Sequence, residues 1–236
     1  MSKCWACTHV GHRRESNEDT VEVSSRNPHG KLHRWRGYVS NNGGWALVAD
    51  GMGGHAAGEV ASELALELLR PVMHRLEDEG EVTSALNAVN DGLFEAMARN
   101  PALYGMGTTI AGVVLRGTEA LAFNVGDSRI YMFSEGKLTR LSIDHVIDGH
   151  VLTQCLGGYS GAPLKPHARR FRLEPYSKLM ICSDGLTDLV SDDEIAGLLS
   201  GHSGAFPALR LTKSALKAGG DDNISVVVFE IDLDDF

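Results

Sequence analysis

The stretch TIAGVVLRGTEALAFNV, residues 109–125, decides the fold class of this chain. Two apolar runs, residues 109–115 and 120–125, flank a turn at Gly117, and this is the pattern of a β-hairpin. A second pattern of the same kind follows at residues 129–141. Hairpins join neighbouring antiparallel strands, so we predict sheets that are largely antiparallel.

Amphipathic helices are predicted on either side of these hairpins in the sequence. Residues 83–99 carry an apolar stripe at helical spacing, formed by Leu86, Val89, Leu93 and Met97. A helix that begins near residue 56 should kink or end at Pro71, another covers residues 206–217, and Ser191 is a predicted N-cap. Further strands are predicted at residues 5–10, 45–49, 169–173, 179–182 and 225–231. Antiparallel sheets with helices on their outer faces define an α+β class, in a single domain over residues 1–236.

The composition limits the class of partner. The chain has 236 residues, 43% of them hydrophobic, and a formal net charge of -9. Such an acidic chain does not suit a nucleic-acid surface, and no apolar run is long enough to cross a bilayer. The N-terminus has no apolar signal region. We therefore expect a cytoplasmic monomer with neither a nucleic-acid nor a membrane partner.

Four cysteines fit a reduced compartment. Cys4 and Cys7 have the gap of a zinc or redox pair. However, Cys7 falls in the predicted strand of residues 5–10 and Cys4 directly precedes it, and in an extended chain a separation of three residues puts the two side chains on opposite faces. We therefore expect no structural zinc site.

Aspartates recur beside glycines at the ends of the apolar runs. The pattern occurs at Asp50-Gly51, Gly126-Asp127, Asp184-Gly185 and Gly220-Asp221-Asp222, and Asn17-Glu18-Asp19 adds another group of carboxylates. Each case alone is also typical of a loop, because Asp and Gly both favour turns. Where several such carboxylates meet, a cation relieves their mutual repulsion. Carboxylate oxygens without thiolates or paired imidazoles favour magnesium or manganese over zinc.

Six segments form an ordered series of motifs along the chain. They are Arg14-Glu15-Ser16-Asn17-Glu18-Asp19, Asp50-Gly51-Met52-Gly53-Gly54-His55, Gly107-Thr108-Thr109, Gly126-Asp127-Ser128-Arg129, Ser183-Asp184-Gly185-Leu186-Thr187-Asp188 and Asp222-Asn223. Together they resemble the type 2C, metal-dependent serine/threonine protein phosphatases, in their bacterial branch. The resemblance covers nearly the whole chain and implies a four-layer αββα sandwich, in which helices flank two antiparallel sheets.

The resemblance also implies a set of site residues. Two Mn2+ or Mg2+ ions, with a weak third, would be held by Asp19, Asp50, Gly51, Asp127, Asp184 and Asp222. Asp50 would bridge the two ions, Glu18 would hold water, and Arg14 would bind the substrate phosphate, so that Asp50 and Arg14 are the expected catalytic residues. Two cations lower the pKa of a bridging water, which then attacks phosphorus. The implied substrate is phosphoserine or phosphothreonine on a protein, either a Ser/Thr kinase or a target of that kinase.

Three other functions stay open at this point. Cys7 and Arg13 have the spacing of a cysteine phosphatase, although residues 8–12 indicate the end of a strand rather than a phosphate loop. Residues 51–58 are glycine-rich, but they lack the lysine and hydroxyl of a P-loop. A catalytically weak pseudophosphatase that only binds a partner would be expected to lack a carboxylate, and none of the expected set is missing. His55 is left out of the catalytic set.

Two segments depart from the family pattern. Relatives carry a helical flap after the position of Asp144-His145, whereas residues 146–166 offer no amphipathic helix of useful length. We predict a flap reduced to an irregular loop, a more open cleft and a weak or absent third metal site. Residues 29–38 form a lengthened basic connection. It is either a hairpin with a solvated basic face or a docking surface for an acidic or phosphorylated partner.

Overall fold

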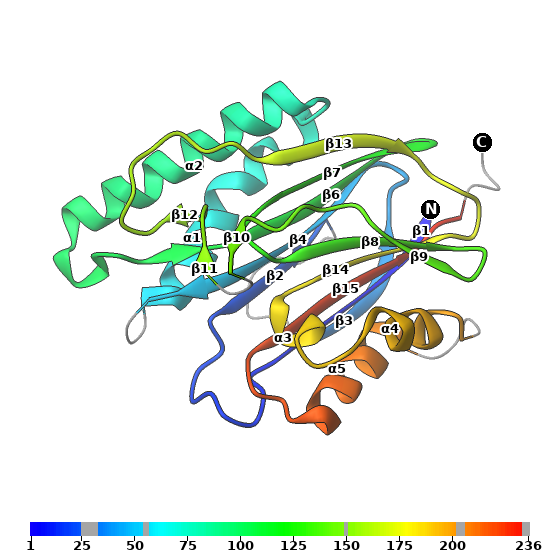
Figure 1. Cartoon of the computed structure of the whole chain (residues 1–236). Helices are drawn as coiled ribbons and strands as arrows, with labels where there is room; N and C mark the ends of the chain where they lie inside the picture. The colour runs from blue at the N-terminus through cyan, green and yellow to red at the C-terminus, as the bar shows by residue number, and fades with distance from the viewer. Residues whose placement is uncertain (25–32, 54–56, 149–150, 202–205, 233–236) are drawn as a thin grey trace.

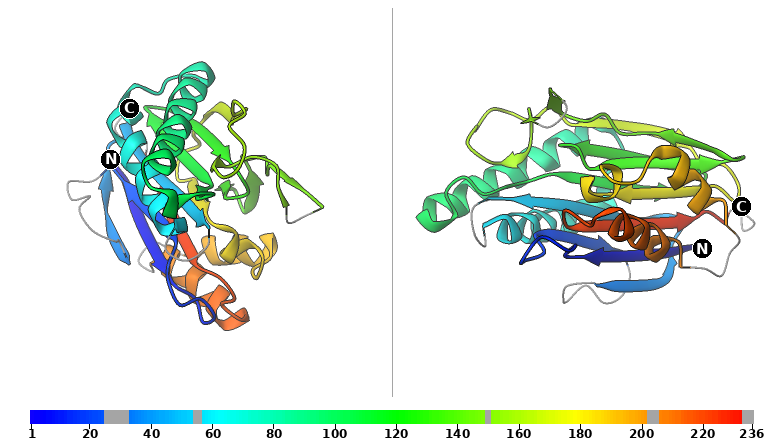
Figure 2. Two further views of the ribbon diagram at one scale, coloured as in Figure 1. Left: turned by 90° about the vertical axis from the view of Figure 1, so that its left-hand side faces the viewer. Right: turned by 60° about the horizontal axis from the view of Figure 1, so that its bottom comes forward.

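Two antiparallel sheets lie face to face in the computed structural model, with helices on both outer sides (Figure 1). Figure 2 shows the same layers from two further directions, with α1 and α2 on one outer side and α4 and α5 on the other. The predicted four-layer αββα sandwich is therefore confirmed. The structure describes residues 1–24, 33–53, 57–148, 151–201 and 206–232.

The first sheet has six strands in the order β3-β1-β15-β14-β8-β9. Every neighbouring pair in it is antiparallel. The strands are β1 (Ser2–His9), β3 (Arg34–Val39), β8 (Arg129–Ser134), β9 (Lys137–Arg140), β14 (Lys178–Cys182) and β15 (Ile224–Glu230).

The second sheet has seven strands in the order β12-β5-β4-β6-β7-β13, and β2 also pairs with β4. The predicted hairpin of residues 109–125 is β6 and β7, paired from Ile110 opposite Val125 to Arg116 opposite Glu119. The strands are β2 (Asp19–Val23), β4 (Asn42–Met52), β5 (Gly107–Thr108), β6 (Ile110–Arg116), β7 (Glu119–Val125), β12 (Leu156–Gly157) and β13 (His167–Arg172).

Alternating side chains along each strand build the layers. In β4, Leu47 packs toward the helices on the outer side, whereas Ala46 and Val48 belong to the core between the two sheets. Cys4 and Cys7 follow the same rule in β1. Cys4 lies between the sheets and Cys7 lies under the outer helices, so their predicted placement on opposite faces is confirmed.

Helices α1 (Ala57–Leu69) and α2 (Glu79–Arg99) cover the seven-stranded sheet, and α4 (Asp192–Leu199) and α5 (Pro207–Ala218) cover the six-stranded one. As predicted, α1 ends before Pro71, which lies in the 3-10 helix η1 (Arg70–Arg75), and Ser191 caps α4. Helix α2 begins at Glu79 rather than at Thr83, because Asp78 accepts a hydrogen bond from the Glu81 N–H and caps it. Two short helices complete the set, η2 (Pro101–Leu103) and α3 (Asp184–Thr187).

The reduced flap is more regular than predicted. It forms a small sheet of β10 (Val146–Ile147) and β11 (Val151–Leu152), followed by β12, which pairs with β5. Two side chains of α2 hold it: Asn90 Oδ1 accepts a hydrogen bond from the Gly157 N–H at 2.7 Å, and Asn87 Oδ1 accepts one from the Leu164 N–H at 2.9 Å. The described part of residues 145–166 contains no helix, but the prediction of an irregular loop was wrong, since these bonds fix the backbone.

Among the helices that the structure describes, none combines the length and the apolar character needed to span a membrane. The predicted helix start near residue 56 lies outside the described residues, as do residues 29–32 of the basic connection. The described part of that connection forms β3, at the edge of the six-stranded sheet.

Candidate metal centre

Aspartates from both sheets meet at one edge of the sandwich. Asp19 begins β2 and lies directly opposite Asp50 near the end of β4. Asp184 follows β14, and Asp222 precedes β15. A cleft of about 560 Å³ opens here, lined by Arg14, Glu15, Ser16, Glu18, Asp50, Gly51, Met52, Gly53, Thr109, Asp127, Leu152, Asp184, Asp222 and Asn223. The fold therefore brings the predicted site residues to one cleft, except that Asp19 does not line it. Asp19 is buried, directly opposite Asp50 in the strand pair.

The backbone of Asp50 is fixed by two threonines. Its N–H donates to Thr109 Oγ1 at 3.0 Å, and its carbonyl accepts from the Thr109 N–H and from Thr108 Oγ1, both at 2.9 Å. Thr109 Oγ1 also shares a hydrogen bond with Ser128 Oγ at 2.7 Å. The motif Gly107-Thr108-Thr109, to which the sequence assigned no role, thus positions Asp50.

Asp19 is held from the opposite sheet. Ser183 Oγ donates to Asp19 Oδ2 at 2.8 Å and also accepts from the Ser225 N–H at 3.0 Å. The other oxygen, Asp19 Oδ1, is buried without a hydrogen-bond partner, and so is Asp184 Oδ1. A buried carboxylate oxygen without a partner is costly, and a cation in the cleft would satisfy both.

The carboxylates raise one another's pKa. Burial raises the pKa of Asp50 well above its ordinary value, and the charges of Asp19 and Asp184 raise it further. Burial is also the first cause of the raised pKa values of Asp19, Asp184 and Asp127. A divalent cation among these groups would favour their ionised forms instead. The donor set consists of hard oxygens, so the residues fit Mn2+ or Mg2+.

The oxygens are gathered but do not yet converge on one point. Among the described residues, no three Asp, Glu, His or Cys side chains stand in the arrangement that a bound ion requires. Both oxygens of Asp222 are engaged in hydrogen bonds: Oδ2 accepts one from Arg14 Nη2 at 2.6 Å, and Oδ1 accepts one from the Asn223 N–H at 2.7 Å. Side-chain rotation of Asp222 would release this oxygen for an ion and the guanidinium of Arg14 for an anion.

Asn223 ties the N-terminal segment of the cleft to β15. Its Oδ1 accepts from the Glu18 N–H at 2.8 Å, and its Nδ2 donates to the carbonyl oxygens of Val10 and Ser16 at 2.9 and 3.0 Å. These bonds bring the segment that carries Arg14 to the rim of the cleft. The motif Asp222-Asn223 contains this residue, but nothing in the sequence indicates its role as a tie between segments.

Gly51 allows α1 to pack against the end of β4. A Cβ atom on Gly51 would lie 2.1 Å from the carbonyl oxygen of Gly58, and one on Gly58 would lie 2.1 Å from Glu18 Oε2. Only glycines fit at both positions, and the backbone of Gly51 stays exposed to the cleft.

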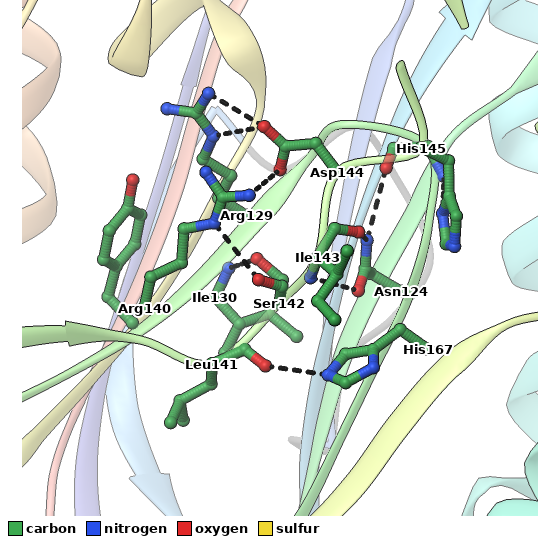
Figure 3. A network of polar contacts seen from close by, with 12 residues as sticks. Asn124, Arg129, Ile130, Arg140, Leu141, Ser142, Ile143, Asp144, His145 and His167 are labelled. Atoms are coloured by element: carbon green, nitrogen blue, oxygen red, sulfur yellow. Dashed lines mark hydrogen bonds and ion pairs between the residues drawn. The ribbon is translucent and has the colours of Figure 1, made fainter. Parts of the chain in front are cut away.

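A partly buried ion network around Asp144 lies next to the turn that carries Asp127, and Figure 3 shows this network. Asp144 contacts Arg129 Nη2 at 2.9 Å and Arg140 Nη2 at 3.0 Å, and its side chain is only 9% exposed. The next residue, His145, accepts a hydrogen bond on Nδ1 from the Gly126 N–H at 3.1 Å. The network thus links β8 and β9 to the turn that places Asp127 in the cleft.

The thiol expected of a cysteine phosphatase is not in the cleft. Cys7 is buried beneath α5, and burial raises the pKa of its thiol. Arg13, its proposed partner, pairs instead with Asp221 at 2.9 Å. All four cysteines are free, and Cys7 is not among the residues that line the cleft. His55 lies outside the described residues.

The sequence profile described as Protein phosphatase 2C matches residues 16–216. This chain belongs to that family. It is 32% identical over 206 residues to the serine/threonine protein phosphatase PstP of Mycobacterium tuberculosis, which covers 78% of this chain and 40% of PstP. It is 31% identical over 214 residues to the serine/threonine phosphatase stp of Listeria welshimeri, covering 79% of this chain and 84% of that protein.

A solved structure shares the same fold. The catalytic domain of PstP in complex with two manganese ions superposes with a TM-score of 0.81 at 29% identity, covering 98% of this chain and 99% of that one. The present chain thus spans less than half the length of PstP, and nearly all of its catalytic domain.

Proposed function

We propose that this protein phosphatase 2C chain hydrolyses phosphoserine and phosphothreonine on proteins, in one domain spanning residues 1–236. The observation that carries the proposal is the cleft in which Asp50, Asp127, Asp184 and Asp222 lie with Arg14. Unpartnered carboxylate oxygens at its base call for cations, and an exposed guanidinium at its rim suits a phosphate. The relatives named as serine/threonine phosphatases support this activity.

Each residue has a proposed role in the cleft. Asp19, Asp50, the Gly51 carbonyl, Asp184 and Asp222 would hold two ions, with Asp127 at a third and weaker site and Glu18 ordering water. Manganese or magnesium, when bound, would neutralise phosphate charge and lower the pKa of water. The structure of the PstP catalytic domain with two manganese ions supports manganese as the bound metal.

Arg14 would bind and orient the substrate. Its guanidinium already hydrogen-bonds a carboxylate in the cleft, and the same planar fork matches two oxygens of a phosphate. Asp50 and Asp184 line the same cleft as Arg14, so a phosphate held by Arg14 would lie beside the residues that would hold the ions. In hydrolysis a water oxygen forms a bond to phosphorus while the bond from phosphorus to the side-chain oxygen of serine or threonine breaks, and that oxygen takes up a proton to leave as the free hydroxyl. Arg14 offsets negative charge on the phosphate as these bonds change.

The partner of this activity is a phosphorylated protein, either a Ser/Thr kinase or a target of that kinase. We propose a monomeric, cytoplasmic enzyme, and four free cysteines fit a reduced compartment. The alternative is a pseudophosphatase that only binds its partner. The complete set of aspartates favours the enzyme, because a binding module has no need for carboxylates that repel one another.

Hydrolysis of a phosphothreonine peptide with manganese, with and without chelator, tests the proposal. We expect phosphate release with manganese and none with chelator. Asp50→Asn should abolish release, whereas Asp193→Asn, the same change on the exposed first turn of α4, should leave it unchanged. Binding of the peptide without any release of phosphate would point to the pseudophosphatase.

A further inference from the structure

A second cavity opens beside the catalytic cleft. Its volume is about 390 Å³, and it lies between the loop at Gly105 and the segment of residues 152–164, which belongs to the reduced flap. Met52, Gly53 and Leu152 line both this cavity and the cleft, so the two spaces adjoin. We call it the flap pocket.

The flap pocket differs from the cleft in chemistry. The cleft is lined by seven charged side chains among its fourteen residues, whereas all residues that line the flap pocket are uncharged. They are Met52, Gly53, Gly105, Leu152, Thr153, Gln154, Cys155, Gly157, Gly158, Tyr159, Ser160, Ala162, Pro163 and Leu164. A charged group entering it would lose hydration without gaining an ionic partner, while an apolar group would gain by leaving water.

Exposed aromatic rings stand at the rim of the flap pocket. Tyr104 and Tyr159 pack edge to face with their ring centroids 5.8 Å apart, yet they are 76% and 81% exposed. Gly105 makes room for this pair, because a Cβ atom there would lie 2.7 Å from the ring of Tyr159. Two adjacent exposed aromatic side chains beside a site are typical of a binding surface.

The walls of the flap pocket are preformed. Asn87 and Asn90 of α2 bind the backbone at Leu164 and Gly157, on two sides of the pocket. Gln154 adds a reciprocal pair of hydrogen bonds with the backbone of Lys165, at 2.7 and 3.3 Å. A pocket with fixed walls loses little entropy when a ligand enters, so its apolar area contributes to affinity.

From these observations we infer that the flap pocket binds a large apolar side chain of the phosphoprotein substrate, near the phosphorylated residue in sequence. The inference rests on the proposed phosphatase function. The phosphate lies in the cleft by Arg14, and the shared wall at Leu152 leads a neighbouring residue of the same peptide into the flap pocket. Substrate choice would then depend on apolar contact at the flap as well as on phosphate binding.

Matched phosphothreonine peptides test this inference. The reference peptide has alanine at every position around the phosphothreonine. In each other peptide a single one of these alanines is replaced by leucine, phenylalanine or aspartate, so that every position is tested with each of the three. We expect one position at which leucine and phenylalanine raise kcat/KM about tenfold over the reference peptide, and at which aspartate gives no gain. Equal rates for all peptides would overturn the inference and leave the phosphatase function standing, whereas failure of every peptide would overturn the phosphatase function itself.

Two variants locate the effect in the flap pocket. Ala162→Phe fills it with a neutral ring, and Tyr159→Ser removes the exposed ring at its rim. Both should cut the preference for leucine or phenylalanine to about twofold or less, measured as the ratio of kcat/KM to that of the alanine peptide with the same variant. Tyr176→Ser is the control, because Tyr176 is also exposed but lies before β14, at the opposite end of that strand from Asp184.

Two results with these variants would contradict the inference. If the preference survived in both, the flap pocket would not be its source. If wild type were a dimer that Tyr159→Ser converted to a monomer, the exposed rings would serve self-association instead. Sedimentation of wild type and variants at the assay concentration distinguishes this second case.

Discussion

Asp19 lies directly opposite Asp50 in the antiparallel register of β2 and β4. Directly opposed residues point to the same face of a sheet, so the two carboxylates stand close together by the geometry of the strand pair. Asp19 is also bound by Ser183, which follows β14 of the other sheet. The candidate metal centre therefore depends on how the two sheets pack, and a change in that packing would move its oxygens.

The first prediction concerns metal-linked stability. Manganese should raise the Tm of the wild-type chain, because an ion that binds only the folded state adds about 2.7 kcal/mol at one hundred times its Kd. Asp50→Asn should lose most of this rise. In chelator, the variant should be at least as stable as wild type, since it removes a buried charge that Asp19 and Asp184 repel. Thermal unfolding with manganese and with chelator measures both effects, and an equal rise in Tm for the two proteins would contradict the prediction.

The second prediction concerns Cys7. Cys7→Ser should keep wild-type phosphatase activity and lose about 1 kcal/mol of stability, because a hydroxyl replaces a thiol in an apolar layer. Iodoacetamide should leave turnover unchanged, since burial raises the pKa of the thiol and keeps it protonated. Inactivation by alkylation at Cys7, with chelator harmless, would restore the cysteine mechanism.

The third prediction concerns the ion network behind Asp127. Asp144→Asn leaves Arg129 and Arg140 without their shared counterion, and should lower the free energy of unfolding by about 2–4 kcal/mol. Glu119→Gln is the matched control. It breaks the exposed pair between Glu119 and Arg170, 2.7 Å apart, and should cost less than about 1 kcal/mol. Urea unfolding compares the two, and a similar loss in both variants would show that burial of the network contributes nothing.

The fourth prediction concerns the basic strand β3. The docking hypothesis stays a prediction, and the structure sharpens its test. The guanidinium of Arg34 lies 5.1 Å from the ring centroid of Phe206, so changing Arg34 would also disturb packing. Arg36 is exposed on the same strand, and its replacement by glutamine should raise the KM for an acidic phosphoprotein several-fold.

The control for Arg36→Gln is Arg172→Gln, an exposed arginine on the edge strand of the other sheet. A small aryl phosphate should be hydrolysed at the same rate by both variants and by wild type. If Arg36→Gln changed the KM for the aryl phosphate as much as for the protein, the effect would lie in the cleft rather than in docking.

Local pattern was sufficient to predict much of this fold. The hairpin of residues 109–125, the apolar stripe of α2 and the cap at Ser191 depend on neighbours in sequence, and each was confirmed. The flap was harder to predict. Asn90 and Asn87 hold its strand β12 and the segment at Leu164, but they lie far away in sequence and carry no signal of periodicity that points to the flap.

The candidate site shows the same difference between features set by local sequence and features set by contacts between distant residues. The recurrence of carboxylates at the ends of apolar runs, mostly beside glycine, indicated a cation site, and the resemblance to the type 2C phosphatases implied which aspartates would hold the ions. The roles of Ser183 and Asn223 were not predicted, because their hydrogen bonds connect residues on different sheets and segments. Buried single hydroxyls and amides are common, so only the three-dimensional arrangement shows which ones position a site.

The last prediction concerns the number of ions. Asp127 lies in the cleft, and burial followed by the charges of Asp144 and Asp188 raises its pKa. With the flap reduced to β10, β11 and β12, we propose that few ligands remain near Asp127, so a third ion binds weakly or not at all. Manganese titration followed by calorimetry should give two tight sites per chain. Asp127→Asn should leave both intact, whereas Asp184→Asn should remove at least one. A third tight site that Asp127→Asn abolishes would show that the reduced flap suffices to hold the ion.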